Sequence, residues 1–171
     1  SGASLTALNA SELGSGTVPA ARLPTGSVIQ VVSAFDSTPY FTTTSSSLQT
    51  TDITATITPS ATSSKIFIIM SFNVATADGD ASNPITFLRK NVGGGGDEGV
   101  MQIDDVSGWQ QDGQANDYLG PTYLDSPSTT SAIVYYVQLA SRDNATTVTV
   151  GNYHTAGNKG GSCITLMEIA G

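Results

Sequence analysis

The segment Lys65–Ala75, KIFIIMSFNVA, constrains the fold more than any other part of the chain. In an extended strand, successive side chains point to opposite faces. One face of this strand would be apolar throughout, and the other would be apolar for half its length. An outer sheet face in a monomeric sandwich is normally polar. We therefore expect the second face to be covered, by a loop of the same chain or by a neighbouring subunit, and we favour the subunit.

Similar strand patterns recur along the sequence, whereas helical periodicity is almost absent. Clusters of Gly, Pro, Asn, Asp and Ser separate them, as is typical of turns. Many short strands in one chain predict an all-β fold, an antiparallel β-sandwich or jelly roll, which we place over residues 26–171. The predicted strands are Ser27–Phe35, Tyr40–Thr44, Ile53–Thr58, Lys65–Ala75, Ile85–Asn91, Val100–Ile103, Ala132–Ser141, Thr146–Tyr153 and Cys163–Ile169.

The segment Gly93–Ser131 shows little strand pattern and is predicted to consist mainly of ordered loops. It holds the only tryptophan and half of the 14 acidic residues of the chain. Long ordered loops in a compact domain are often functional. The acidic residues are Asp97, Glu98, Asp104, Asp105, Asp112, Asp117 and Asp125.

Aromatic and polar side chains in this segment form the expected recognition surface. Aromatic rings stack on the apolar faces of sugars, and carboxylates and amides bond the hydroxyl groups; the same mixture also suits protein recognition. The alternative is that the tryptophan fills the sandwich or a seam between subunits. The candidate receptor-binding residues are Trp109, Asp112, Gln114, Asn116, Asp117, Tyr118 and Tyr123.

Residues 1–25 are predicted to be a separate, extended segment. Its apolar residues recur at regular intervals, but a single copy is too poor in apolar groups to bury them. Three copies packed about a three-fold axis could do so. The residues expected to form this trimeric shaft are Leu5, Leu8, Leu13, Val18 and Leu23.

The stretch LTALNASELGSGTVPAARLP resembles a shaft repeat of bacteriophage tail fibres. The stretches PTGSVIQVV, ITATITPSATSSKIFIIMSFNV and GGSCITLMEIAG are similar to strands of the C-terminal heads of such fibres. The resemblance implies a homotrimer in the virion, joined to the rest of the fibre. It also implies a receptor-binding tip that attaches the phage to a glycan or an outer-membrane protein of the host bacterium. The alternatives are an accessory head or collar fibre, a structural trimerisation tip, and a hydrolase of surface glycans.

The charge balance argues against several partners. The net charge is −8, and the six basic residues are scattered. Binding to nucleic acid or to an anionic membrane needs clustered Lys and Arg. No apolar run is long enough to span a bilayer, so membrane insertion is not expected. The chain reads as a piece of a longer protein.

No motif predicts catalysis, a metal or another cofactor. Asp104 and Asp105 are adjacent, so a strand would point them to opposite faces, unlike a glycosidase pair. The stretch DGDASN at residues 78–83 lacks the calcium-loop pattern, and GGGGDEG lacks the ending of a phosphate loop. His154 has no second histidine for zinc. Cys163 is expected to be a small buried apolar residue.

Overall fold

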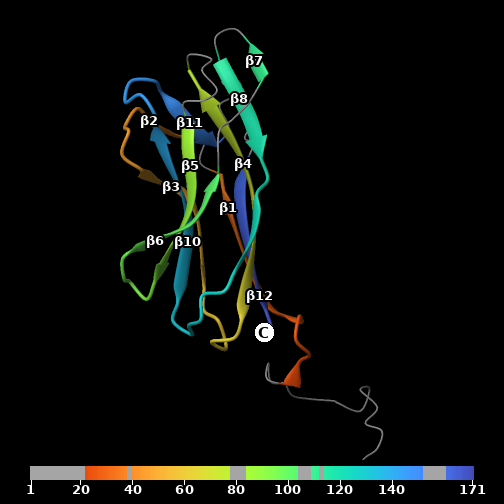
Figure 1. Cartoon of the computed structure of the whole chain (residues 1–171). Coiled ribbons are helices and arrows are strands. Elements are labelled where there is room, and N and C mark those ends of the chain that lie inside the picture. Colours follow the sequence, from red (N-terminus) through yellow and green to blue (C-terminus); the bar gives the residue numbers. More distant parts are fainter. Residues whose placement is uncertain (1–21, 38–39, 78–83, 104–108, 112–113, 152–160) are drawn as a thin grey trace, which may run out of the picture.

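The computed structural model describes residues 22–37, 40–77, 84–103, 109–111, 114–151 and 161–171; for 109–111 and 114–116 it describes the backbone alone. Twelve strands and no α-helix occur in these residues, which confirms the predicted all-β class (Figure 1). The strands are β1 (Val28–Asp36), β2 (Tyr40–Thr43), β3 (Gln49–Ile57), β4 (Lys65–Thr76), β5 (Pro84–Val92), β6 (Asp97–Ile103), β7 (Trp109–Gln111), β8 (Gln114–Leu119), β9 (Thr122–Asp125), β10 (Ile133–Ser141), β11 (Val148–Gly151) and β12 (Ser162–Ile169).

These strands form two antiparallel sheets that face each other, as in a β-sandwich (Figure 1). The smaller sheet has the order β3-β10-β5-β6. The larger sheet has the order β1-β12-β4-β11-β2, with β8 and β9 also paired to β4 and with β7 paired to β8. Apart from the β5–β6 and β7–β8 pairs, neighbouring strands are not consecutive in the chain, so the fold depends on long-range pairing.

Strand β4 is the centre of the larger sheet. Its first half pairs with β12 on one side and β9 on the other, so that Ile66 lies opposite both Glu168 and Asp125. Its second half pairs with β11 and β8, so that Val74 lies opposite both Val150 and Asp117. Four of the other strands therefore take their register from this one segment.

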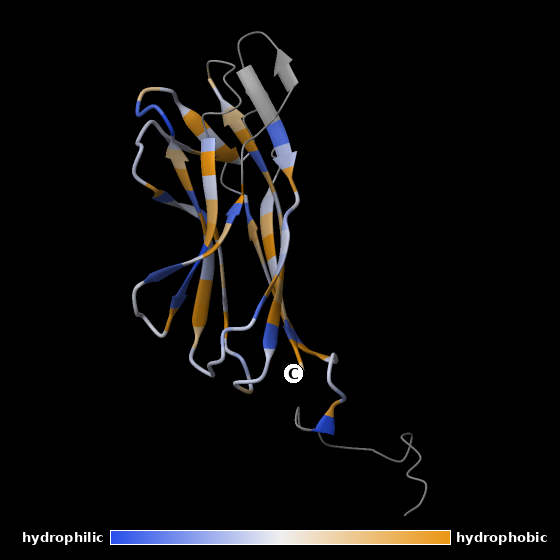
Figure 2. Ribbon diagram, in the orientation of Figure 1, coloured by the Kyte–Doolittle hydropathy of each residue, from blue (hydrophilic) through white to orange (hydrophobic). Residues whose placement is uncertain are grey.

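The core lies between the two sheets and is built by alternation along the strands. On β4 the five residues from Ile66 to Val74 at every second position are at most 1% exposed. They pack with Leu88, Tyr135 and Val137 of the smaller sheet and with Ile164 of β12. Apolar residues recur along the strands of both sheets (Figure 2). The apolar face predicted for Lys65–Ala75 is thus the core face.

The prediction for Gly93–Ser131 was wrong in one respect, because this segment holds β7, β8 and β9 as well as all of β6. Strands β8 and β9 form against the exposed edge of β4, whose backbone groups supply the pairing. In β8, Ala115, Asn116 and Asp117 have low strand propensity, and sheet context overrode that propensity. The nine predicted strands all occur, with ends shifted by a few residues.

The face that points away from the core is covered differently on β4 and on β10. On β10, neighbouring side chains of the same sheet cover it: Tyr136 is buried beside Arg89, and the Gln138 amide donates to Thr50. On β4, Phe67 and Ile69 remain half-exposed in the single chain. The described part of one copy therefore leaves the second face of β4 open.

A buried ion pair links the two sheets. Lys90 Nζ of β5 lies 2.9 Å from Asp125 Oδ2 of β9, and the Tyr135 hydroxyl of β10 donates to the same oxygen at 2.7 Å. Both charged side chains are nearly buried, with 13% and 11% of their surface exposed. Burial, followed by the bond to Asp125, raises the pKa of Tyr135. Glu98 lies 3.8 Å from the same ammonium but is exposed.

We expect Asp125→Ala to lower the free energy of unfolding by roughly 3 kcal/mol, because it leaves Lys90 buried without its close partner. The matched control is Glu98→Ala, which removes the exposed partner of the same lysine and should change stability by less than about 0.5 kcal/mol. Urea denaturation of both variants measures the difference. Equal losses would show that the buried pair does not hold the sheets together.

Candidate functional site

The strongest candidate for a recognition surface is the β7–β8 hairpin. It lies at the end of the molecule opposite the C-terminus and residues 22–27 (Figure 1). The pairing explains this position, because Lys65 at the start of β4 lies opposite Ile169, whereas Thr76 at its end lies opposite Ala115 of β8. A 12-residue strand spans about 40 Å. The hairpin is thus held out at the far end of the longest strand.

The hairpin brings together three of the predicted receptor-binding residues. Trp109 lies opposite Asn116, and Gln114 lies opposite Gln111 next to the turn. Asp112 lies outside the described residues. An aromatic residue and amides therefore share one end of the fold, as the sequence predicted, although through a strand pair and not through a long loop.

The other three predicted residues lie apart from the hairpin tip. Tyr118 points outward from β8, is 65% exposed, and shares a hydrogen bond with the Ser71 hydroxyl. Asp117 precedes it on the opposite side, is half-buried, and accepts a bond from the Tyr118 amide at 2.8 Å. Tyr123 packs against the core from β9. The structure thus divides the six predicted residues that it describes among different surroundings.

Of the predicted shaft residues, only Leu23 lies in the described part of the chain, and Leu5, Leu8, Leu13 and Val18 lie outside it. Leu23 is half-buried. It lines a cavity of about 230 Å³ together with Ile29 and Ala170. This leucine therefore packs onto the end of the sandwich from which β1 starts.

Beside this cavity lies a buried carboxylate that the sequence did not single out. Glu168 of β12 is fully buried, and Ser60, Ser64 and Gln30 donate four hydrogen bonds to it at 2.6 to 2.7 Å. Burial acts to raise the pKa of the Glu168 carboxyl, but the bonds from Ser60, Ser64 and Gln30 outweigh it, and the pKa is lowered. The carboxylate ties the β3–β4 turn to β1 and β12. The position of Glu168, a single acidic residue in an otherwise apolar predicted strand, could have indicated this site from the sequence, because a buried charge needs hydrogen-bond partners.

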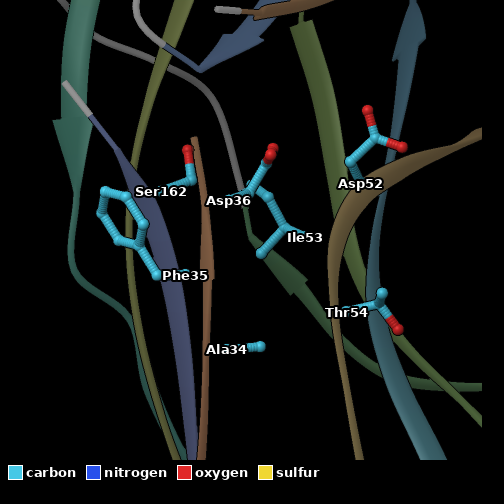
Figure 3. A pocket seen from close by; sticks show the side chains of 7 residues that line it. All are labelled: Ala34, Phe35, Asp36, Asp52, Ile53, Thr54 and Ser162. Carbon is cyan, nitrogen blue, oxygen red and sulfur yellow. The ribbon is translucent and has the colours of Figure 1, made fainter. Parts of the chain in front are cut away.

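A second cavity of about 250 Å³ opens between the edge strands β1 and β3 (Figure 3). Asp36 and Asp52 stand on opposite sides of it, above Ala34 and Thr54 (Figure 3). Among the described residues, its lining contains no His, Cys, Lys or Arg. Two carboxylates, from opposite edge strands, therefore line this cavity.

A polar cluster lies on the outward side of the smaller sheet. Arg89 Nη2 donates to the Asp97 carbonyl at 3.2 Å, and Asn91 donates to the Asp97 carboxylate at 3.4 Å. The Tyr136 hydroxyl lies buried beside Asp97, without a hydrogen bond of normal geometry in the described structure. Tyr136, then Asn91 and Arg89, lower the pKa of Asp97, while burial and Asp97 raise the pKa of Tyr136 to about 12. The cluster fixes the β5–β6 hairpin.

Several other sequence candidates lie outside the described residues, namely Asp104, Asp105, residues 78–83 and His154. Among the described residues, no three His, Cys, Asp or Glu side chains gather to hold a metal ion. Cys163 is only half-buried, which corrects the expected buried position. Alternate residues of β12 face outward, and Cys163 is one of them, opposite Phe35 and Ser71.

Comparison with known proteins adds no relatives: no protein-family model matches the chain, and no curated protein matches it. Within the described ranges there is no helix of the length and hydrophobicity that crossing a bilayer requires.

We expect Glu168→Gln to lower the free energy of unfolding by roughly 1–3 kcal/mol near neutral pH. The NH2 group of the new side-chain amide would face hydroxyl and N–H groups that are themselves donors. Since the folded-state pKa lies below the ordinary value of 4.5, the carboxylate stabilises the fold above that value and loses this effect as the pH falls through the folded pKa. The difference between wild type and variant should persist at neutral pH and should shrink as the pH falls below about 4.5. The control is the exposed Asp52→Asn. A pH-independent difference would contradict the role of the charge.

Proposed function

We propose that this chain is the distal, non-enzymatic tip of a trimeric bacteriophage fibre, and that it binds the surface of the host bacterium. The observation that carries the proposal is the placement of the two ends of the head. The chain enters beside Leu23 and Glu168, whereas the β7–β8 hairpin stands at the opposite end (Figure 1). A shaft joined at the base would therefore present the hairpin outward.

The resemblance of residues 5–24 to a fibre shaft supports the same arrangement. On this proposal residues 1–25 form the shaft segment, and residues 26–171 form a jelly-roll head. Three copies would display three hairpins in one direction. Weak contacts of each hairpin would then combine through multivalency, without new chemistry at any one site.

The chemistry of the hairpin suits a bacterial surface glycan. Trp109 supplies an aromatic ring for stacking, and Gln114 and Asn116 supply amides that bond hydroxyl groups. Adhesion needs no proton transfer or nucleophile.

The test is to label bacteria with the fluorescent protein and to compare wild type with the double variant Trp109→Ala, Asn116→Ala. We expect loss of labelling on every strain that the wild type labels, because the variant removes the ring and its cross-strand partner. The matched control is Thr56→Ala, an exposed change on the smaller sheet. Flow cytometry over a panel of strains gives the readout.

Two outcomes would contradict the proposal in different ways. Unchanged labelling by the double variant would place recognition elsewhere on the head. Wild-type protein that labels no strain, and that does not compete with phage for adsorption, would favour an accessory or purely structural tip.

A further inference from the structure

The outward face of the larger sheet is apolar. All six of the large apolar side chains that are strongly exposed in the described structure lie on this side, as the strand registers show. Half-exposed Phe67, Ile69 and Met167 fill the space between them. We call this surface the outer apolar face. Its exposed members are Val28, Val31, Phe35, Tyr40, Tyr118 and Leu124.

Charge is almost absent from this face. Along the described strands of the larger sheet, the only charged side chain on it is Lys65, at the end where the chain enters. The outward side of the smaller sheet differs, since it carries Asp52, Arg89 and Asp97 among threonines. Large exposed apolar patches on a soluble domain mark interaction sites. The two outward faces are therefore built for different surroundings.

The ring of Phe35 projects from the outer apolar face. Its side chain is 68% exposed. Nevertheless its ring occupies the place where a side chain at position 161 would begin, since a Cβ on Gly161 would lie 1.8 Å from Phe35 Cζ. The glycine thus makes room for the ring against the sheet. An exposed aromatic ring seated in this way is suited to enter a matching surface.

We propose that the outer apolar face is the surface through which copies of this chain meet. The partner that we infer is a second copy of the chain, because a face that carries almost no charge is best covered by another surface without charge. The position of the N-terminal segment also favours a second copy of the chain as the partner. Residues 1–21 precede the described chain and include Leu5, Leu8, Leu13 and Val18, and Val28 at the start of β1 already lies on the face. Copies that meet here would bring these apolar segments together.

This inference rests on the proposed assembly into a trimer but not on receptor binding. The experiment is light scattering of purified wild type and of two variants, Val31→Lys and Leu124→Lys. Both positions are about half exposed in the single chain, so a lysine there can be solvated without unfolding the head. We expect wild type at three times the chain mass of 17.5 kDa and both variants at 17.5 kDa. Thr56→Lys, on the smaller sheet, is the control and should remain a trimer.

Cys163 provides a second readout that needs no substitution. It lies on the outer apolar face, half-buried within one copy, next to Phe35. In the assembled wild type and in Thr56→Lys it should be protected from a thiol reagent. In Val31→Lys this protection should be lost, while circular dichroism shows the same strand content.

The outcomes separate the inference from the proposed function. A trimeric wild type with variants that stay trimeric, or with a freely labelled Cys163, would overturn the interface and leave the trimer standing. A monomeric wild type would overturn the assembly itself. Loss of bacterial labelling in trimeric protein would bear on the receptor alone.

Discussion

The alternation of side chains along β4 is the constraint on which the rest of the structure depends. Every second residue of this strand enters the core, and its backbone pairs with β12 and β11 on one side and with β9 and β8 on the other. A shift by one residue would expose Phe72 and bury Asn73. The register of β4 therefore fixes at once the core and the composition of the outward face.

Two buried carboxylates complement this apolar framework at positions where the sheets must be held together. Asp125 accepts from Lys90 and Tyr135 across the two sheets, and Glu168 accepts four hydrogen bonds beside the start of β1. Each is costly to bury and is useful only with all its partners in place. They select one arrangement of turns and strands that hydrophobic burial alone would not distinguish.

The sequence predicted the core strands well because their signal is local. Lys65–Ala75 and Ala132–Ser141 each have one face that is apolar throughout, and both segments form strands. The polar strand β8 and the four-residue strand β9 could not be predicted, because they form through pairing with β4, roughly 50 residues away in the chain. The same dependence on distant partners hid the roles of Glu168 and Asp125. It also divided Tyr118 and Tyr123, which the sequence had assigned to one surface, between the outward face and the core.

The outward face of the larger sheet is apolar, the outward face of the smaller sheet carries charges, and the β7–β8 hairpin lies apart from both at the far end. These surfaces can therefore serve different purposes. An adhesive surface must remain in contact with solvent until it meets its target, whereas an assembly surface must leave solvent early. The apolar side chains lie along the flank of the larger sheet, from Val28 beside the chain's point of entry toward Tyr118. The hairpin of Trp109 and Asn116 lies beyond them, at the far end. Assembly through the flank would leave that end free in every copy, so that recognition and assembly could change independently.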